Sequence, residues 1–229
     1  MSDIEAVIFD LDGCLVDSEV HSLEVLAAEL ADAGMGEMTV QLLRERFLGV
    51  SIAAIIDHAV QRSGQPRPDG FAERFEDRLF QRFRSRLRLI EGVPDLLETL
   101  RARGIATAIA TGSSVRRLAV TLDCVGLTDD FKGTGFSADQ VARGKPAPDL
   151  FLLAANGLGV APHRCAVMED SPLGVAGAIS AGMRPVGFVG GSHLDGMRDT
   201  HAARLRDAGA FTIRDDAAKM ADALLDGAI

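Results

Sequence analysis

From residue 92 to the C-terminus, segments with strand character alternate with segments with helical character. Strands are predicted at 105–110, 131–135, 165–168, 185–189 and 210–213, with a helix between each strand and the next. Parallel strands need such helical crossovers, so this order favours a parallel sheet with helices on both faces. A separate apolar run at residues 6–9 also has the character of a buried strand. We therefore expect one sheet that contains this early strand and the later ones.

The chain between residue 18 and about residue 89 shows no strand pattern. Apolar residues recur there at helical spacing in three stretches, 23–30, 52–59 and 71–87, which are separated by glycine or proline. The total of 229 residues also exceeds a single domain of about 150 residues. We predict an α/β fold with a doubly wound, Rossmann-like parallel sheet in a core of residues 1–16 and 90–229. An all-helical cap of residues 17–89 is inserted into this core.

The composition excludes several classes of partner. The formal net charge of −9 argues against nucleic acid and against an anionic membrane surface. The chain has no Trp and no Tyr, which further disfavours binding of single-stranded nucleic acid. No apolar run is long enough for a spanning helix, and the three cysteines include no Cys-x-x-Cys pair. We expect a cytoplasmic protein without disulfides, either a monomer or a weak homo-oligomer.

Polar residues follow the predicted strands at their carboxyl ends, where open parallel sheets bind ligands. These residues are Asp10 and Asp12 after the first strand, Thr111, Gly112 and Ser113 after the second, Lys145 before a later helix, and Glu169 and Asp170 after the strand at 165–168. Each motif alone has a simpler explanation, such as a polar turn, a helix cap or a surface lysine. Their occurrence at successive strand ends makes those separate explanations a poor account of the whole set.

The residue types suit transfer of a phosphoryl group to a carboxylate. Asp10 and Asp12 are two positions apart, so both side chains can reach one reacting group. One carboxylate of such a pair can act as nucleophile while the other exchanges protons. A carboxylate repels a phosphate dianion, so the site needs positive charge, and Lys145 supplies part of it.

Further positive charge is expected from a metal ion. The carboxylates of Asp10, Asp170 and Glu169 form a set of hard oxygen ligands that suits Mg²⁺. Thr111 and the N–H groups of the helix start at 112–114 supply neutral donors for phosphoryl oxygens. The five histidines show no metal-ligand spacing, so we expect surface or structural roles for them.

The same motifs resemble those of the haloacid dehalogenase superfamily of phosphohydrolases. The residues that carry the resemblance are Phe9-Asp10-Leu11-Asp12-Gly13, Asp17-Ser18-Glu19, Thr111, Lys145-Pro146 and Glu169-Asp170-Ser171. The helical insert directly after the first motif is similar to the β-phosphoglucomutase and sugar-phosphate phosphatase branch of that superfamily. The resemblance covers the whole chain.

The resemblance implies a role for each acidic residue. Asp10 would be the nucleophile that forms an aspartyl phosphate. Asp12 would protonate the leaving oxygen and then activate water. Mg²⁺ would be held by Asp10, the carbonyl of Asp12 and Asp170, with help from Glu169.

The resemblance also implies contacts to the substrate. Thr111 and Lys145 would bind the transferred phosphoryl group, together with Gly112 and Ser113. The leaving group would contact cap residues when the cap closes, namely Ser18, Glu19, Leu48 and Gly49.

Departures from the family pattern favour hydrolysis. True dehalogenases of the family lack the second acid, whereas Asp12 is present here. Related mutases carry basic residues where Leu48 and Ile52 stand, and their hinge histidine aligns with Ser22, although His21 is one position away. We predict a Mg²⁺-dependent phosphatase of a small phosphorylated metabolite. The resemblance of residues 46–50 points to a sugar phosphate or a sugar-acid phosphate such as 6-phosphogluconate. A phosphomutase is the alternative, and a non-enzymatic interaction protein on the same scaffold is less favoured.

Overall fold

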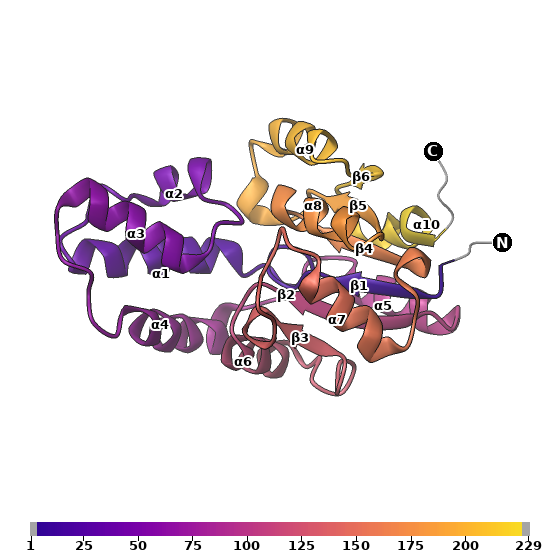
Figure 1. The fold of residues 1–229 in the computed structure, drawn as a ribbon. Coiled ribbons are helices and arrows are strands. Elements are labelled where there is room, and N and C mark those ends of the chain that lie inside the picture. Colours follow the sequence, from indigo (N-terminus) through magenta and orange to yellow (C-terminus); the bar gives the residue numbers. More distant parts are fainter. Residues whose placement is uncertain (1–3, 226–229) are drawn as a thin grey trace. The chain divides into compact units, whose positions relative to one another are not determined.

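The computed structural model describes residues 4–225, which form two compact units (Figure 1). The helical unit consists of Ser18–Leu87. The core unit combines the chain up to Asp17 with the chain from Arg88 onward. The outermost residues of the predicted core, 1–3 and 226–229, lie outside the described residues.

The core unit contains a six-stranded parallel sheet with the strand order β3-β2-β1-β4-β5-β6. The strands are β1 (Ala6–Phe9), β2 (Ala106–Thr111), β3 (Gly135–Ser137), β4 (Cys165–Glu169), β5 (Arg184–Phe188) and β6 (Thr212–Arg214). In the register of the sheet, Ala6 of β1 is opposite Ala106 of β2 and Cys165 of β4. β2 and β3 lie on one side of β1, and β4, β5 and β6 lie on the other, so the strand order reverses at β1. Ligands bind at such a switch point of a doubly wound sheet. The predicted doubly wound parallel sheet is confirmed.

Helices cover both faces of the sheet because its central strands are apolar on both sides (Figure 1). On one face Ile8 packs in a buried cluster with Phe151 and Ala178. Phe9 is equally buried and points to the opposite face, since side chains alternate along a strand. The helices of the core are α5 (Val93–Ala102), α6 (Val115–Val125), α7 (Asp149–Leu158), α8 (Pro172–Ser180), α9 (Arg198–Asp207) and α10 (Met220–Leu225).

Two strands are shifted from their predicted positions. The strand expected at 131–135 is β3 at Gly135–Ser137, and the strand expected at 210–213 is β6 at Thr212–Arg214. Phe131 lies in a turn before β3, where its ring packs edge-on against Phe9 with 6.3 Å between ring centroids. The prediction of β3 was wrong because the pattern counts this buried aromatic as a strand residue. The strand itself is short and begins with glycine.

The helical unit contains α1 (Glu19–Asp32), α2 (Val40–Arg46), α3 (Ile52–Ser63) and α4 (Phe71–Arg86). Leu43 is the buried residue of α2, so this helix has no apolar stripe to mark it in the sequence. α1 and α4 pack together, and the buried carboxylate of Glu29 on α1 lies 3.0 Å from Arg78 Nε on α4. Charge pairing thus accompanies apolar packing between these two helices.

Within residues 4–225, no helix combines the length and the apolar character that crossing a membrane requires. Within the same residues, Cys14, Cys124 and Cys165 form no disulfide.

Candidate active site

The predicted core residues meet at the carboxyl edge of the sheet. Asp10 follows β1 directly, Thr111 ends β2, and Glu169 ends β4 with Asp170 next in the chain. Because these three strands are parallel neighbours, their carboxyl ends lie side by side. Lys145 comes from the segment between β3 and α7 and reaches both Asp10 and Glu169.

Lys145 carries positive charge into this acidic group. Its Nζ donates to Oδ1 of Asp10 and to Oε1 of Glu169, each at 2.5 Å, and all three side chains are nearly buried. Burial alone would lower the pKa of Lys145, but the charges and hydrogen bonds of the two carboxylates outweigh it and raise that pKa above its ordinary value. Lys145 therefore stays charged at neutral pH and fixes the positions of both acids.

Glu169 is held at both of its carboxylate oxygens. Oε1 accepts from Lys145, and Oε2 accepts the N–H of Ser171 at 2.8 Å. A Cβ atom at Gly174 of α8 would lie 1.8 Å from Oε1 of Glu169, so this position has room only for glycine. The arrangement makes Glu169 an anchor for Lys145. Its predicted help in binding a metal stays a prediction.

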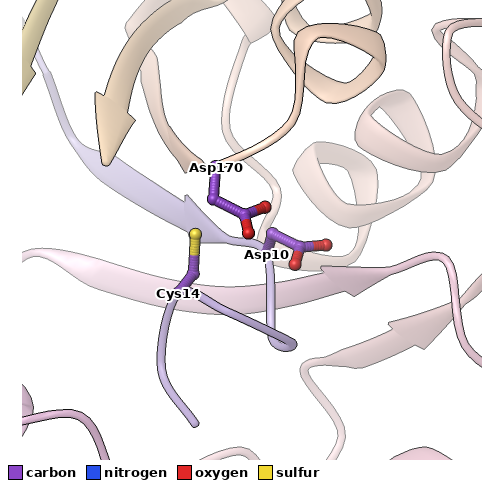
Figure 2. A group of neighbouring side chains, drawn as sticks. All are labelled: Asp10, Cys14 and Asp170. Atoms are coloured by element: carbon purple, nitrogen blue, oxygen red, sulfur yellow. The ribbon is translucent and has the colours of Figure 1, made fainter. Parts of the chain in front are cut away.

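Asp10 and Asp170 form a compact group with the thiol of Cys14 (Figure 2). One ligand atom from each of the three residues lies within 4.8 Å of the others. Burial raises the pKa of both carboxyl groups, Glu169 adds to this shift, and Lys145 opposes it. The ionised forms of both acids are thus disfavoured without further positive charge. A divalent cation would supply that charge, and the carboxylate oxygens are ligands that suit it.

Asp12 points its carboxylate to Arg117 on α6 and to Ser113 in the loop between β2 and α6. Its Oδ1 accepts from Nη2 of Arg117 and its Oδ2 accepts from the hydroxyl of Ser113, both at 2.7 Å. Arg117 is buried on α6 and was not among the predicted site residues. The pair Arg116-Arg117 gives no sequence signal of which guanidinium turns inward, so the sequence pattern alone does not reveal this contact.

Two histidines contact Asp170, and neither is among the predicted site residues. Nε2 of His193 lies 3.1 Å from Oδ2 of Asp170, and Nε2 of His201 lies 2.6 Å from its main-chain oxygen. Burial lowers the pKa of His201, although its hydrogen bond to Asp170 opposes that shift. Both residues lie in the segment after β5, where the sequence shows no motif.

The loop after β2 is a preformed turn beside these acids. The main-chain N–H of Ser113 donates to Oγ1 of Thr111 at 3.0 Å, and the hydroxyl of Ser137 donates to the carbonyl of Ser113 at 2.6 Å. Gly112 between them is exposed. Ser114 then caps α6 by accepting the N–H of Arg117 at 3.0 Å. The turn thus lies at the same sheet edge as Asp10.

The predicted cap residues all lie in the helical unit. Ser18 precedes α1 and Glu19 is its first residue, while Leu48 and Gly49 lie in the connection between α2 and α3. Gly49 has a φ of 76°, which a side chain would strain. Contact of these residues with a leaving group stays a prediction.

The model of a protein family described as haloacid dehalogenase-like hydrolase matches residues 4–182. The chain belongs to the haloacid dehalogenase-like hydrolases. The match contains Asp10, Asp12, Lys145 and Asp170, and it confirms the superfamily that the motifs predict. His193 and His201 lie beyond the matched residues.

Relatives of this haloacid dehalogenase-like hydrolase include a phosphatase and a mutase. A phosphorylated carbohydrates phosphatase of Thermotoga maritima is 32% identical, over 84% of this chain and 88% of its own. The β-phosphoglucomutase of Bacillus subtilis is 33% identical, over 84% of this chain and 87% of its own. A solved structure of a HAD family hydrolase from Deinococcus radiodurans, with bound phosphate and sodium, has a TM-score of 0.77 and 33% identity, and the match covers 99% of this chain and 97% of that one.

Proposed function

We propose that this hydrolase is a Mg²⁺-dependent phosphatase that acts on a small phosphorylated metabolite through an aspartyl-phosphate intermediate. The observation that carries the proposal is the position of Asp10. Its carboxylate lies beside Asp170 and 2.5 Å from Nζ of Lys145. A nucleophilic oxygen, a fixed cation and a second acidic ligand thus meet at one point, as attack on an anionic phosphate requires.

The groups that would hold Mg²⁺ are the carboxylates of Asp10 and Asp170 and the carbonyl of Asp12. When bound, Mg²⁺ supplies positive charge that offsets the repulsion between a carboxylate and a phosphate. Lys145 adds a permanent charge at the same carboxylate. A thiol such as that of Cys14 is a poor ligand for this hard cation, so the oxygen atoms are the expected ligands.

In the first step an oxygen of Asp10 attacks phosphorus and forms a new O–P bond, while the bond from phosphorus to the ester oxygen breaks. Asp12 gives its proton to the departing oxygen, so the alcohol leaves and Asp10 carries the phosphoryl group. The hydroxyl of Thr111, the N–H groups of its turn and Lys145 bind the phosphoryl oxygens.

In the second step Asp12 takes a proton from water as the water oxygen attacks phosphorus. The bond between phosphorus and Asp10 breaks, which releases inorganic phosphate and restores the carboxylate. Arg117 and Ser113 both donate to the oxygens of Asp12 and so hold this carboxyl group in position for the step.

We infer a phosphorylated sugar or sugar acid, such as 6-phosphogluconate, as the substrate class. The support is the relative in Thermotoga maritima, whose name gives phosphorylated carbohydrates as its substrates. Residues 46–50, which resemble those of sugar-phosphate phosphatases, run from the last residue of α2 into the connection to α3 in the helical unit.

A phosphomutase is the second candidate because of the 33% identity to β-phosphoglucomutase. A mutase has to hold a second phosphate and return the first to a sugar. Ser22, at the position of the mutase histidine, donates its hydroxyl to the carbonyl of Ser18 at 3.1 Å within the helical unit. Ile52 begins α3 and brings no charge. Hydrolysis is therefore the function we propose.

The test is an assay of purified protein with Mg²⁺ against hexose phosphates, 6-phosphogluconate and phosphoglycolate. We expect release of inorganic phosphate from a sugar or sugar-acid phosphate, loss of this activity in EDTA, and recovery when Mg²⁺ is returned. Asp10→Asn should abolish turnover with an unchanged circular dichroism spectrum. Asp123→Asn, at an exposed position of α6, is the matched control and should keep full activity.

The outcomes separate the candidate functions. Release of no phosphate from any ester would contradict the phosphatase. Formation of an isomeric sugar phosphate in the presence of a sugar bisphosphate activator would establish the mutase instead. Retained hydrolysis in Asp10→Asn would remove Asp10 as nucleophile.

A further inference from the structure

Asp170 is held at two points by the segment that follows β5. His193 contacts its carboxylate and His201 contacts its main-chain oxygen, at the distances given above. A carbonyl oxygen only accepts hydrogen bonds, so Nε2 of His201 carries the hydrogen. Each histidine is 2% exposed, so these contacts are shielded from competing water.

Two glycines leave the space that the His193 ring occupies. A Cβ atom at Gly191 would lie 2.6 Å from Nδ1 of His193, and one at Gly13 would lie 2.8 Å from its Cε1. The Cβ atom at Gly13 would also lie 2.2 Å from Oδ2 of Asp170. Real Cβ contacts are not this short, so both positions must be glycine for the imidazole to reach the carboxylate.

The turn that carries His193 is itself tied to the segment after β1. His193 is the middle residue of a 3₁₀ turn, Ser192–Leu194. The N–H and the hydroxyl of Ser192 both donate to Oδ1 of Asp17, at 3.1 and 2.8 Å. The turn that carries His193 is therefore fixed in position, and its imidazole ring fills the space that the two glycines leave.

We propose that His193 and His201 are positioning residues that set Asp170 for a divalent cation. The inference rests on the proposed function, because it takes Asp10 and Asp170 as the ligands. A donor on Oδ2 fixes the rotation of the Asp170 carboxylate and leaves the other oxygen for the cation. A donor on the carbonyl fixes the backbone from which that carboxylate projects. Loss of such an outer partner typically weakens metal binding by about 10–100-fold.

The test measures binding of Mn²⁺ to the purified, substrate-free protein by titration calorimetry and electron paramagnetic resonance. The dissociation constant of His193→Ala should rise by about 10–100-fold, and that of His201→Ala should rise as well. His193→Gln keeps an N–H donor and should recover part of the affinity. His163→Ala, at an exposed position in the turn before β4, should bind Mn²⁺ like the unchanged protein.

A second variant keeps the histidine and moves it. Gly191 has a φ of −63°, which alanine adopts without strain, so Gly191→Ala should fold and push on the imidazole. We expect weaker Mn²⁺ binding in this variant too. In both Gly191→Ala and His193→Ala, the Mg²⁺ concentration for half-maximal hydrolysis should rise while kcat at saturating Mg²⁺ is kept. A general loss of structure would lower kcat as well.

The result that overturns the inference alone is unchanged Mn²⁺ affinity in His193→Ala and Gly191→Ala, in a protein that binds Mn²⁺ and hydrolyses an ester. A protein that binds no divalent cation and hydrolyses no ester overturns both the inference and the proposed function.

Discussion

Arg117 donates from Nη2 to Oδ1 of Asp12 at 2.7 Å, although the two residues are 105 positions apart in the chain. The two side chains are only 8% and 11% exposed. Because Ser113 donates to the other oxygen, both oxygens of the Asp12 carboxylate are engaged. The acid that we propose to exchange protons with the leaving group and with water therefore has a defined orientation.

Replacement of Arg117 by Met should misplace Asp12 and lower kcat by up to about 100-fold, since small displacements of catalytic groups have effects of this size. KM should change little if Arg117 acts through Asp12 and not on the substrate. Arg117→Lys keeps one charge without the planar fork and should be intermediate. Steady-state kinetics on the best ester measure this, with the exposed Arg103→Ala as control. Unchanged kcat in Arg117→Met would contradict the positioning role.

Lys145→Met should destabilise the metal-free protein by about 3–5 kcal/mol near pH 8, because it leaves buried carboxylates without their cation. Asp10 and Glu169 are the carboxylates concerned. Mg²⁺ should return part of the lost stability by replacing some of the positive charge. Urea unfolding with and without Mg²⁺ measures both effects, and Lys132→Met, at an exposed position, is the control. Equal stability of Lys145→Met and the unchanged protein would argue against a buried ion pair.

Gly174→Ala should lower both stability and activity. Alanine in a helix is normally more stable than glycine by about 1 kcal/mol. Here the added Cβ atom would lie 1.8 Å from Oε1 of Glu169, so the carboxylate must leave Lys145 and Ser171. Thermal unfolding and the ester assay check this prediction. A higher melting temperature with full activity would show that Glu169 tolerates displacement.

The meeting of Asp10 with Glu169 and Asp170 was predictable because one topological rule places them. Strands in a parallel sheet end at one edge, so Asp10 and Asp170 had to become neighbours once the strands were recognised. No rule of this kind applies to Arg117, whose inward direction depends on how α6 rotates on the sheet. His193 is positioned by a turn and by gaps at Gly13 and Gly191, which leave no periodic pattern.

The bounds of the helices and strands were less predictable than which residues meet at the sheet edge. The apolar residues before β3 indicate burial but not strand structure. Phe131 is buried against Phe9 without belonging to a strand. Short helices also escape detection, since α2 has Leu43 as its buried residue and so lacks an amphipathic stripe. The predicted site residues still come together despite these errors, because most of them follow strand ends near β1 and β4, which the apolar runs mark clearly.

Cys14 should resist alkylation in the folded protein. Its thiol is buried, and burial together with the charges of Asp170 and Asp10 raises its pKa well above the ordinary value. A raised pKa means less thiolate, which is the reactive form. Iodoacetamide at pH ~8 should modify Cys124, which is partly exposed, before Cys14. Peptide mass spectrometry of the native and the urea-denatured protein distinguishes the sites, and rapid native labelling of Cys14 would contradict the prediction.

His201 should make the folded protein less stable as the pH falls. Burial lowers its pKa below the ordinary 6.5, so the unfolded chain takes up this proton before the folded protein does. The stabilising contribution is therefore fully present above pH 6.5 and is lost as the pH falls through the lowered pKa of the folded state. A structural reason is that Nδ1 of His201 has no hydrogen-bond partner within residues 4–225, so a proton there would be buried without an acceptor.

His201→Gln removes this titration, so its free energy of unfolding should fall less than that of the unchanged protein between about pH 8 and pH 5. Urea unfolding in EDTA at several pH values measures the difference. Subtracting the two curves removes the contributions that both proteins share, including those of Asp10 and Asp170, whose raised pKa values act in the opposite direction. Identical slopes for the two proteins would mean that protonation of His201 is not linked to folding.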